Sequence, residues 1–156
     1  MSFSKQDMIA SVVVWYCPEK GYVNNLKTYS NYVHHTWVID NSPVENSYLL
    51  DDLGSVTYVF IGRNSGVASG MNEGCLRAIE KGYKYILTMD QDSFFDEVDI
   101  AHHLTSGLQV MLDEKIAVVS PVFTSHVASR SETELFEAKS SITSGSLIRL
   151  SAWRSV

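Results

Sequence analysis

Residues 85–92 read YILTMDQD, an apolar run that ends in two closely spaced carboxylates. The run from Tyr85 to Met89 is short and apolar, which is typical of a strand buried inside a sheet. Asp90 and Asp92 follow it directly, with Gln91 between them. Parallel sheets bind their ligands beyond the carboxyl ends of their strands. The stretch therefore predicts a buried strand that leads into a ligand site.

Similar apolar runs recur on both sides of this stretch and alternate with segments of helical spacing. The other predicted strands are 8–16, 36–39, 56–61, 116–123 and 146–150. Apolar residues spaced three or four apart predict helices between them: Tyr22, Leu26, Tyr29 and Val33; Val67, Met71, Cys75 and Ala78; Ile100, Leu104, Leu108 and Met111. Strands that alternate with helices of this length imply parallel pairing. The sequence thus predicts an α/β fold, an open and mostly parallel sheet with helices on both faces.

The helix over 67–78 has the clearest boundaries. Asn64 and Ser65 are candidate N-caps, and Gly82 stands just past its end. Gly70 and Gly74 within it leave two interpretations open: a ligand approaches the backbone closely, or the helix packs tightly on the sheet. After the strand over 146–150, Ser151 could cap another helix.

Composition restricts the class of protein. The 156 residues include 12 basic and 18 acidic side chains, a net charge of -6, with no basic run that could follow a nucleic acid backbone. We therefore expect one domain, 1–156, without a nucleic acid partner. Cys17 and Cys75 lack the spacing of a zinc site, and Cys75 sits on an apolar helical stripe as core filler. No run is long enough to span a membrane, so we expect a cytoplasmic protein, with peripheral attachment at the inner face of the membrane left open.

Polar residues follow each predicted strand where ligands would bind. Asp90 and Asp92 repel each other unless a cation lies nearby, so they indicate either a Mg²⁺ or Mn²⁺ site that also binds a diphosphate, or a solvated acidic turn. Asp40, before the turn residues Asn41 and Ser42, either accepts hydrogen bonds from a ribose or base, or caps the turn without a ligand. The remaining strand-end candidates are Cys17, Pro18, Arg63 and Asn64. The five histidines fit no metal-chelating spacing and are expected on the solvated surface.

Four of these segments, in this order, resemble family 2 glycosyltransferases, and among them the bacterial rhamnosyltransferase-like group. They are the first strand with the following Pro18, the segment VIDNS at 38–42, the segment NSGVASGMNEG at 64–74 and the segment YILTMDQDS at 85–93. The resemblance implies a GT-A fold and an inverting, metal-assisted transfer of a sugar from a nucleoside diphosphate to a saccharide or lipid-linked acceptor. It favours dTDP-rhamnose as the donor, with a UDP-sugar as the alternative.

The resemblance also implies roles for individual residues. Asp40 would contact the base, Asn64 and Arg63 would line the nucleotide pocket, and Asp92 would hold the metal. Asp90 would lie by the ribose and sugar, next to Gln91, Cys17 and Pro18. The segment 144–146 resembles the part of the family that borders the donor sugar and acceptor. Trp15, Tyr16 and Cys17 stand where relatives carry smaller residues, which leaves the contacts of the first loop open.

Family members place their catalytic base beyond the point that corresponds to Val156, so we expect a fragment of a longer enzyme and name no base. A non-catalytic module that binds a nucleotide-sugar is the alternative, which acceptor activity would decide. A nucleotidyltransferase is less compatible with the sequence, because residues 19–21 do not form the glycine-rich basic loop that such enzymes carry after their first strand.

Overall fold

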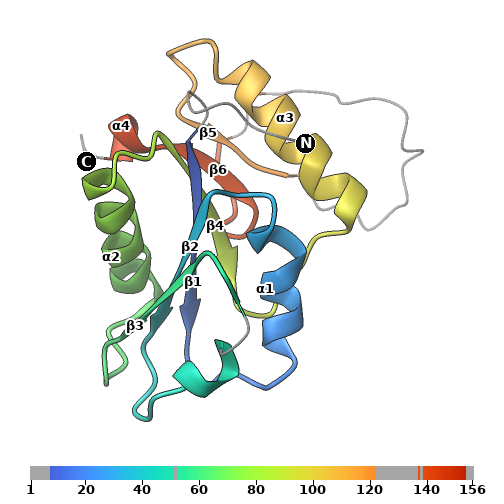
Figure 1. Ribbon diagram of the computed structural model, residues 1–156. Helices are drawn as coiled ribbons and strands as arrows, with labels where there is room; N and C mark the ends of the chain where they lie inside the picture. The colour runs from blue at the N-terminus through green and yellow to red at the C-terminus, as the bar shows by residue number, and fades with distance from the viewer. Residues whose placement is uncertain (1–7, 51–52, 122–136, 138, 154–156) are drawn as a thin grey trace.

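A computed structural model describes residues 8–50, 53–121, 137 and 139–153. Its centre is a six-stranded sheet in the order β3-β2-β1-β4-β6-β5 (Figure 1). The strands are β1 Ile9–Trp15, β2 His35–Asp40, β3 Val56–Phe60, β4 Tyr85–Asp90, β5 Val118–Val119 and β6 Ser146–Arg149. β1 pairs in parallel with β2 and β4, and β2 with β3, whereas β6 runs antiparallel to β4 and β5. The predicted sheet, open and mostly parallel, is confirmed.

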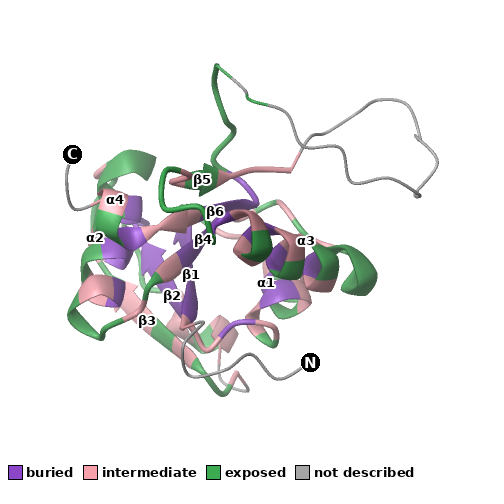
Figure 2. Ribbon diagram, turned by 90° about the horizontal axis from the view of Figure 1, so that it is seen from above, coloured by how far each residue is buried: buried purple, intermediate pink, exposed green. Residues whose placement is uncertain are grey.

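Helices cover both faces of the sheet, as predicted. They are α1 Tyr22–Ser30, the 3₁₀ turn η1 Ser47–Leu50, α2 Val67–Glu80, α3 Glu97–Val110 and α4 Leu150–Trp153. In the view from above, α1 and α3 lie on one side of the strands and α2 and α4 on the other (Figure 2). Each face therefore has its own hydrophobic core.

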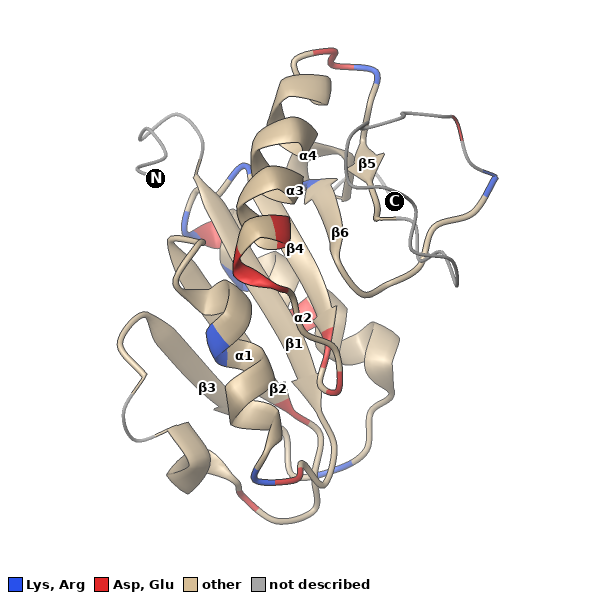
Figure 3. Cartoon of the chain, turned by 90° about the vertical axis from the view of Figure 1, so that its right-hand side faces the viewer, with Lys and Arg blue, Asp and Glu red and all other residues tan. Residues whose placement is uncertain are grey.

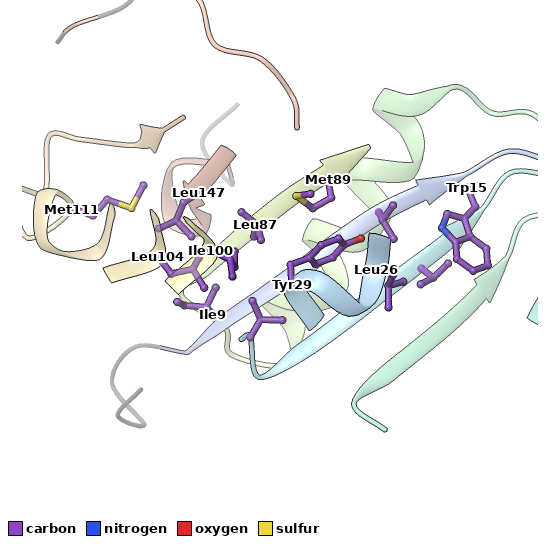
Figure 4. Packing of buried hydrophobic residues seen from close by; sticks show 13 residues of the cluster. Ile9, Trp15, Leu26, Tyr29, Leu87, Met89, Ile100, Leu104, Met111 and Leu147 are labelled. Carbon is purple, nitrogen blue, oxygen red and sulfur yellow. The ribbon is translucent and has the colours of Figure 1, made fainter. Parts of the chain in front are cut away.

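β1 belongs to both cores because its side chains alternate between the faces. Ile9, Val13 and Trp15 pack with the residues of α1 and α3 (Figure 4), while Val12 and Val14 pack with those of α2. All seven β1 residues are buried. A central strand covered on both sides reads as a continuous apolar run, which explains why the sequence pattern of this strand shows no alternation.

Three predicted boundaries are corrected. The strand expected over 116–123 is only β5, Val118–Val119, and residues 122 and 123 lie outside the described part. The helix after β6 begins at Leu150, so Ser151 lies inside α4 and does not cap it. α1 ends at Ser30, and Val33 reaches the core from the following turn. Within the described residues no helix is long and apolar enough to cross a membrane.

Candidate functional site

The carboxyl ends of β1 and β4 lie side by side at the point where the order of the sheet reverses. The chain moves from β1 through α1 to β2 and then to β3, and returns through α2, on the other face, to β4 on the opposite side of β1. The register pairs Val14 with Asp90 and Trp15 with Asp40. This place, beyond the carboxyl ends of β1 and β4, is the switch point of the sheet, and open α/β sheets usually bind their ligands there.

Asp90 and Asp92 lie at the β4 side of this switch point. Asp90 is half-buried at the end of β4, and Asp92 is exposed two residues later. Burial, and secondly the charge of Asp92, raises the pKa of the Asp90 carboxyl. Figure 3 shows acidic segments at the end of β4 and at the start of α3. The Asp90 backbone N–H donates to Ser144 Oγ at 3.2 Å, which attaches the segment before β6 to the same site.

Gln91, expected to bind the donor, has its side-chain amide turned toward the backbone of Tyr16. Gln91 Oε1 accepts a hydrogen bond from the Tyr16 N–H at 2.9 Å, and Gln91 Nε2 donates to the Tyr16 carbonyl at 3.3 Å. The Gln91 carbonyl accepts from Asn25 Nδ2 at 3.2 Å. The side chain therefore extends the β1–β4 pairing beyond the strands and holds the residues after β1 and β4 together.

Asp40 is fully buried and accepts hydrogen bonds from within the protein. Its Oδ1 accepts from the Ser42 N–H at 2.8 Å, which is the turn-capping arrangement that the sequence left open. Its Oδ2 accepts from Asn46 Nδ2 at 2.9 Å and from the Tyr58 hydroxyl at 2.5 Å. In this conformation the carboxylate presents no surface to solvent, so the structure does not bring Asp40 together with the exposed candidates.

The loop after β2 is also bonded to the loops after β1 and β3. Ser42 Oγ accepts from the Cys17 N–H at 2.8 Å, and the Asn41 N–H donates to the Trp15 carbonyl at 2.8 Å. Cys17 is exposed and has φ 47, a left-handed conformation that non-glycine residues seldom adopt. Pro18 beside it is half-buried. Asn41 Nδ2 donates to the Gly66 carbonyl at 3.0 Å, and Asn41 Oδ1 accepts from Ser65 Oγ at 2.9 Å.

Arg63 and Asn64 are exposed on the β3–α2 loop, which follows the carboxyl end of β3. The sequence analysis predicted Asn64 or Ser65 as the N-cap of α2, and this prediction is wrong. The N-cap is Gly66 with φ 84, and Asn64 Oδ1 accepts from the Gly66 N–H at 3.1 Å. Only a residue without a Cβ adopts this backbone conformation readily. The Asn64 side chain therefore stabilises the turn before the helix and does not cap the helix itself.

Gly70 and Gly74 serve the packing of α2 on the sheet. A Cβ at Gly70 would lie 2.7 Å from Val14 Cγ2, and one at Gly74 would lie 2.2 Å from Val12 Cγ2. The packing interpretation of these glycines is therefore confirmed. Cys75, on the same helix, is fully buried, and its burial raises the pKa of its thiol to about 12, which confirms it as core filler.

The expectation that the histidines lie on the solvated surface holds for His102 and is wrong for His34, His35 and His103, which are half-buried, while His126 lies outside the described residues. His103, on α3, contacts the segment before β6. Its Nε2 lies 2.7 Å from the Gly145 carbonyl, and its ring stacks on Phe95 with a centroid distance of 5.6 Å. Burial lowers the pKa of His103, against the raising effect of the Gly145 bond. His103 lies three residues after the buried Ile100, and this helical spacing could have predicted that it faces inward.

Tyr58 and Asn46 were missed by the sequence analysis. Tyr58 shares a face of β3 with Val56, and both pack on the core that α1 and α3 cover. Alternation along the strand could have predicted that Tyr58 faces this core, but not that its hydroxyl reaches Asp40. Asn46 gives no signal in the sequence beyond belonging to a polar loop.

The donor set at Asp90 and Asp92 fits a Mg²⁺ or Mn²⁺ ion. Both cations prefer oxygen ligands, and a cation near the two carboxylates would relieve the repulsion by Asp92 that, after burial, raises the pKa of Asp90. The described residues contain no group of three or more His, Cys, Asp and Glu side chains placed to hold a metal. The remaining ligands would thus come from water or from a ligand such as a diphosphate, as is usual for Mg²⁺.

The class of fold agrees with a solved structure. A crystal structure of 4-diphosphocytidyl-2C-methyl-D-erythritol synthase matches with a TM-score of 0.52 and 14% sequence identity, covering 94% of this chain and 77% of that chain. At this identity the likeness concerns the fold alone. The chain has a Rossmann-like α/β fold, and the predicted fold class is confirmed.

A particular relative is found at the level of sequence. The dTDP-rhamnosyl transferase RfbF of Shigella flexneri is 32% identical in an alignment of 123 residues, which covers 74% of this chain and 38% of that protein. No protein-family model matches the chain. The chain is therefore a partial homologue of a rhamnosyl transferase and spans less than half of its length.

Proposed function

We propose that this chain forms the donor-binding part of a glycosyltransferase that transfers rhamnose from dTDP-rhamnose to a saccharide or lipid-linked acceptor. The observation that carries the proposal is the pair Asp90 and Asp92 at the switch point, where burial and mutual repulsion raise the pKa of Asp90. The partial identity to a dTDP-rhamnosyl transferase supports the choice of donor.

The proposed reaction is the displacement of the nucleoside diphosphate from the anomeric carbon by an acceptor hydroxyl, with inversion at that carbon. Asp90 and Asp92 would hold a Mg²⁺ or Mn²⁺ ion, which when bound supplies positive charge beside the leaving diphosphate. Arg63 and Asn64 line the nucleotide side, and their exposure leaves them available to a ligand. Cys17 and Pro18 border the first loop, whose position the Gln91 amide fixes through Tyr16.

Titration calorimetry of dTDP, UDP and GDP, with Mn²⁺ or with EDTA, tests this proposal. We expect dTDP to bind in the presence of Mn²⁺, and Asp92→Ala to abolish the metal-dependent part. Glu114→Gln, which removes an exposed acid beyond the end of α3, is the matched control and should bind as the wild type does. Absence of binding by the folded wild-type protein would refute the donor site, and preference for UDP or GDP would refute the donor named here.

A further inference from the structure

The hydrogen bonds of Asp40 form a closed network at the carboxyl end of β2. Tyr58 donates its hydroxyl proton to Asp40 Oδ2, and the same hydroxyl accepts from the Asn46 N–H at 2.8 Å. Asn46 Nδ2 donates to Asp40 Oδ2 as well. With the Ser42 N–H on Oδ1, the buried carboxylate has three donors, all of them supplied by the protein. A base could reach this carboxylate only if Tyr58 and Asn46 first moved away.

The same network extends to the loops that carry the exposed candidates. Ser42, held by Asp40 through its N–H, supports through its hydroxyl the left-handed backbone of Cys17. Asn41, the residue between Asp40 and Ser42, bonds to Ser65 and Gly66 on the loop after β3. A displacement at Asp40 would therefore move both loops.

We propose that Asp40 is a positioning residue, which holds the loops after β1 and β3 from a buried position and does not itself contact the base. This inference rests on the proposed function, since it concerns the nucleotide side of that same site. It differs from the role implied by the family resemblance, in which Asp40 reads the base. The two roles predict opposite behaviour when Tyr58 loses its hydroxyl.

Tyr58→Phe removes one of the three donors and keeps the ring in the core. If Asp40 positions the loops, affinity for dTDP and for CDP falls by the same factor, about three- to tenfold for the loss of one buried hydrogen bond. Their affinity ratio stays at the wild-type value. If Asp40 reads the base, the freed carboxylate binds dTDP more tightly, and Asp40→Asn lowers the affinity for dTDP, whose base presents an N3–H donor, more than the affinity for CDP, whose N3 is an acceptor. Either of those results would overturn the proposal.

Amide hydrogen exchange, measured by NMR without nucleotide, tests the same network independently. We expect the amides of Cys17 and Ser42 to exchange faster in Tyr58→Phe and in Asp40→Asn, while the α3 amides keep their wild-type rates. Unchanged exchange at Cys17 and Ser42 in a folded variant would overturn the positioning role. If the wild-type protein binds no nucleotide, the proposed function fails, and the exchange rates still decide whether Asp40 holds the loops. Tyr58→Phe keeps the test valid should Asp40→Asn fail to fold.

Discussion

Gln91 lies in the sequence between the two carboxylates of the candidate site. Its side chain connects the end of β4 to Tyr16, the residue after β1. Replacing it by Ala removes both hydrogen bonds to Tyr16 and leaves two backbone groups to water. We expect the free energy of unfolding to fall by about 1 kcal/mol, since each net contribution is modest and one bond is long. Urea unfolding measures this change.

Gln91→Glu is the informative companion to the Ala variant. Glu keeps the acceptor for the Tyr16 N–H but places a carboxylate oxygen against the Tyr16 carbonyl, so its stability should lie at or below that of Gln91→Ala. A stability of Gln91→Glu equal to the wild type would mean that the bond to the carbonyl contributes nothing.

Asp90 makes the stability of the protein depend on pH. Because its pKa is raised in the folded state, the folded protein binds this proton more tightly than the unfolded chain does. The resulting stabilisation is complete below the ordinary pKa of an aspartic acid and is lost as the pH rises through the raised value. Asp90→Asn removes this effect, so in EDTA it should be more stable than the wild type at neutral pH.

The difference between Asp90→Asn and the wild type should shrink on acidification to about pH 3, below the ordinary pKa of aspartic acid. Denaturant unfolding at both pH values measures it, with Glu114→Gln as the control for loss of an exposed acid. A difference that is independent of pH would show that the Asn side chain acts through packing and not through charge.

At the scale of elements, the contact between α2 and β1 depends on glycine. A Cβ at Gly74 would lie 2.8 Å from Val12 Cβ, close to the backbone of a buried strand, whereas one at Gly107 would meet Leu147 Cδ2, the end of a flexible side chain, at 2.9 Å. We expect Gly74→Ala to cost about 1–3 kcal/mol and Gly107→Ala less, because Leu147 can turn away. Thermal unfolding ranks them, with Gly54→Ala, which meets no atom within 4 Å, as the neutral control.

An equal loss of stability in Gly74→Ala and Gly107→Ala would contradict this account. It would mean that the helix–sheet spacing adjusts as easily at α2 as a leucine rotamer does at α3, and that the close contact of α2 with β1 is not what excludes a larger residue.

A helix or strand could be predicted from the sequence where a local pattern of apolar residues determines it. α2 has a regular apolar stripe and a glycine stop, and the strands β1 and β4 are continuous apolar runs, so their positions follow from local pattern. The burial of Asp40 was not predictable, because it depends on Tyr58, whose position is set by the β2–β3 register. Gln91 is similar: nothing local indicates that its amide bonds to Tyr16. The sequence correctly indicated that the candidate residues follow the carboxyl ends of the strands. It did not indicate which of these polar side chains are already hydrogen-bonded within the protein.

At the scale of the whole molecule, the sheet should open from its edges. β1 and β4 are each paired on both sides, while β3 and β5 each have one partner in the described structure. We expect the slowest amide hydrogen exchange in β1 and β4 and faster exchange in β3. Exchange mapped by mass spectrometry checks this order, and equal protection of β1 and β3 would indicate that the described edge of β3 is covered in solution.

Met8 and Leu150, which lie near the two ends of the described chain, are both hydrogen-bonded to the backbone of Lys84. The Lys84 N–H donates to the Met8 carbonyl, and the Lys84 carbonyl accepts from the Leu150 N–H, so the start of β1 and the start of α4 share one backbone anchor. This anchor lies at the start of β4, and Asp90 lies at the opposite end of the same strand (Figure 1). A protein immobilised on a sensor surface through this end of the sheet would thus present the carboxyl ends of β1 and β4, with Asp90 and Asp92, to the flowing solution, and a scaffold could display many copies facing outward in the same orientation.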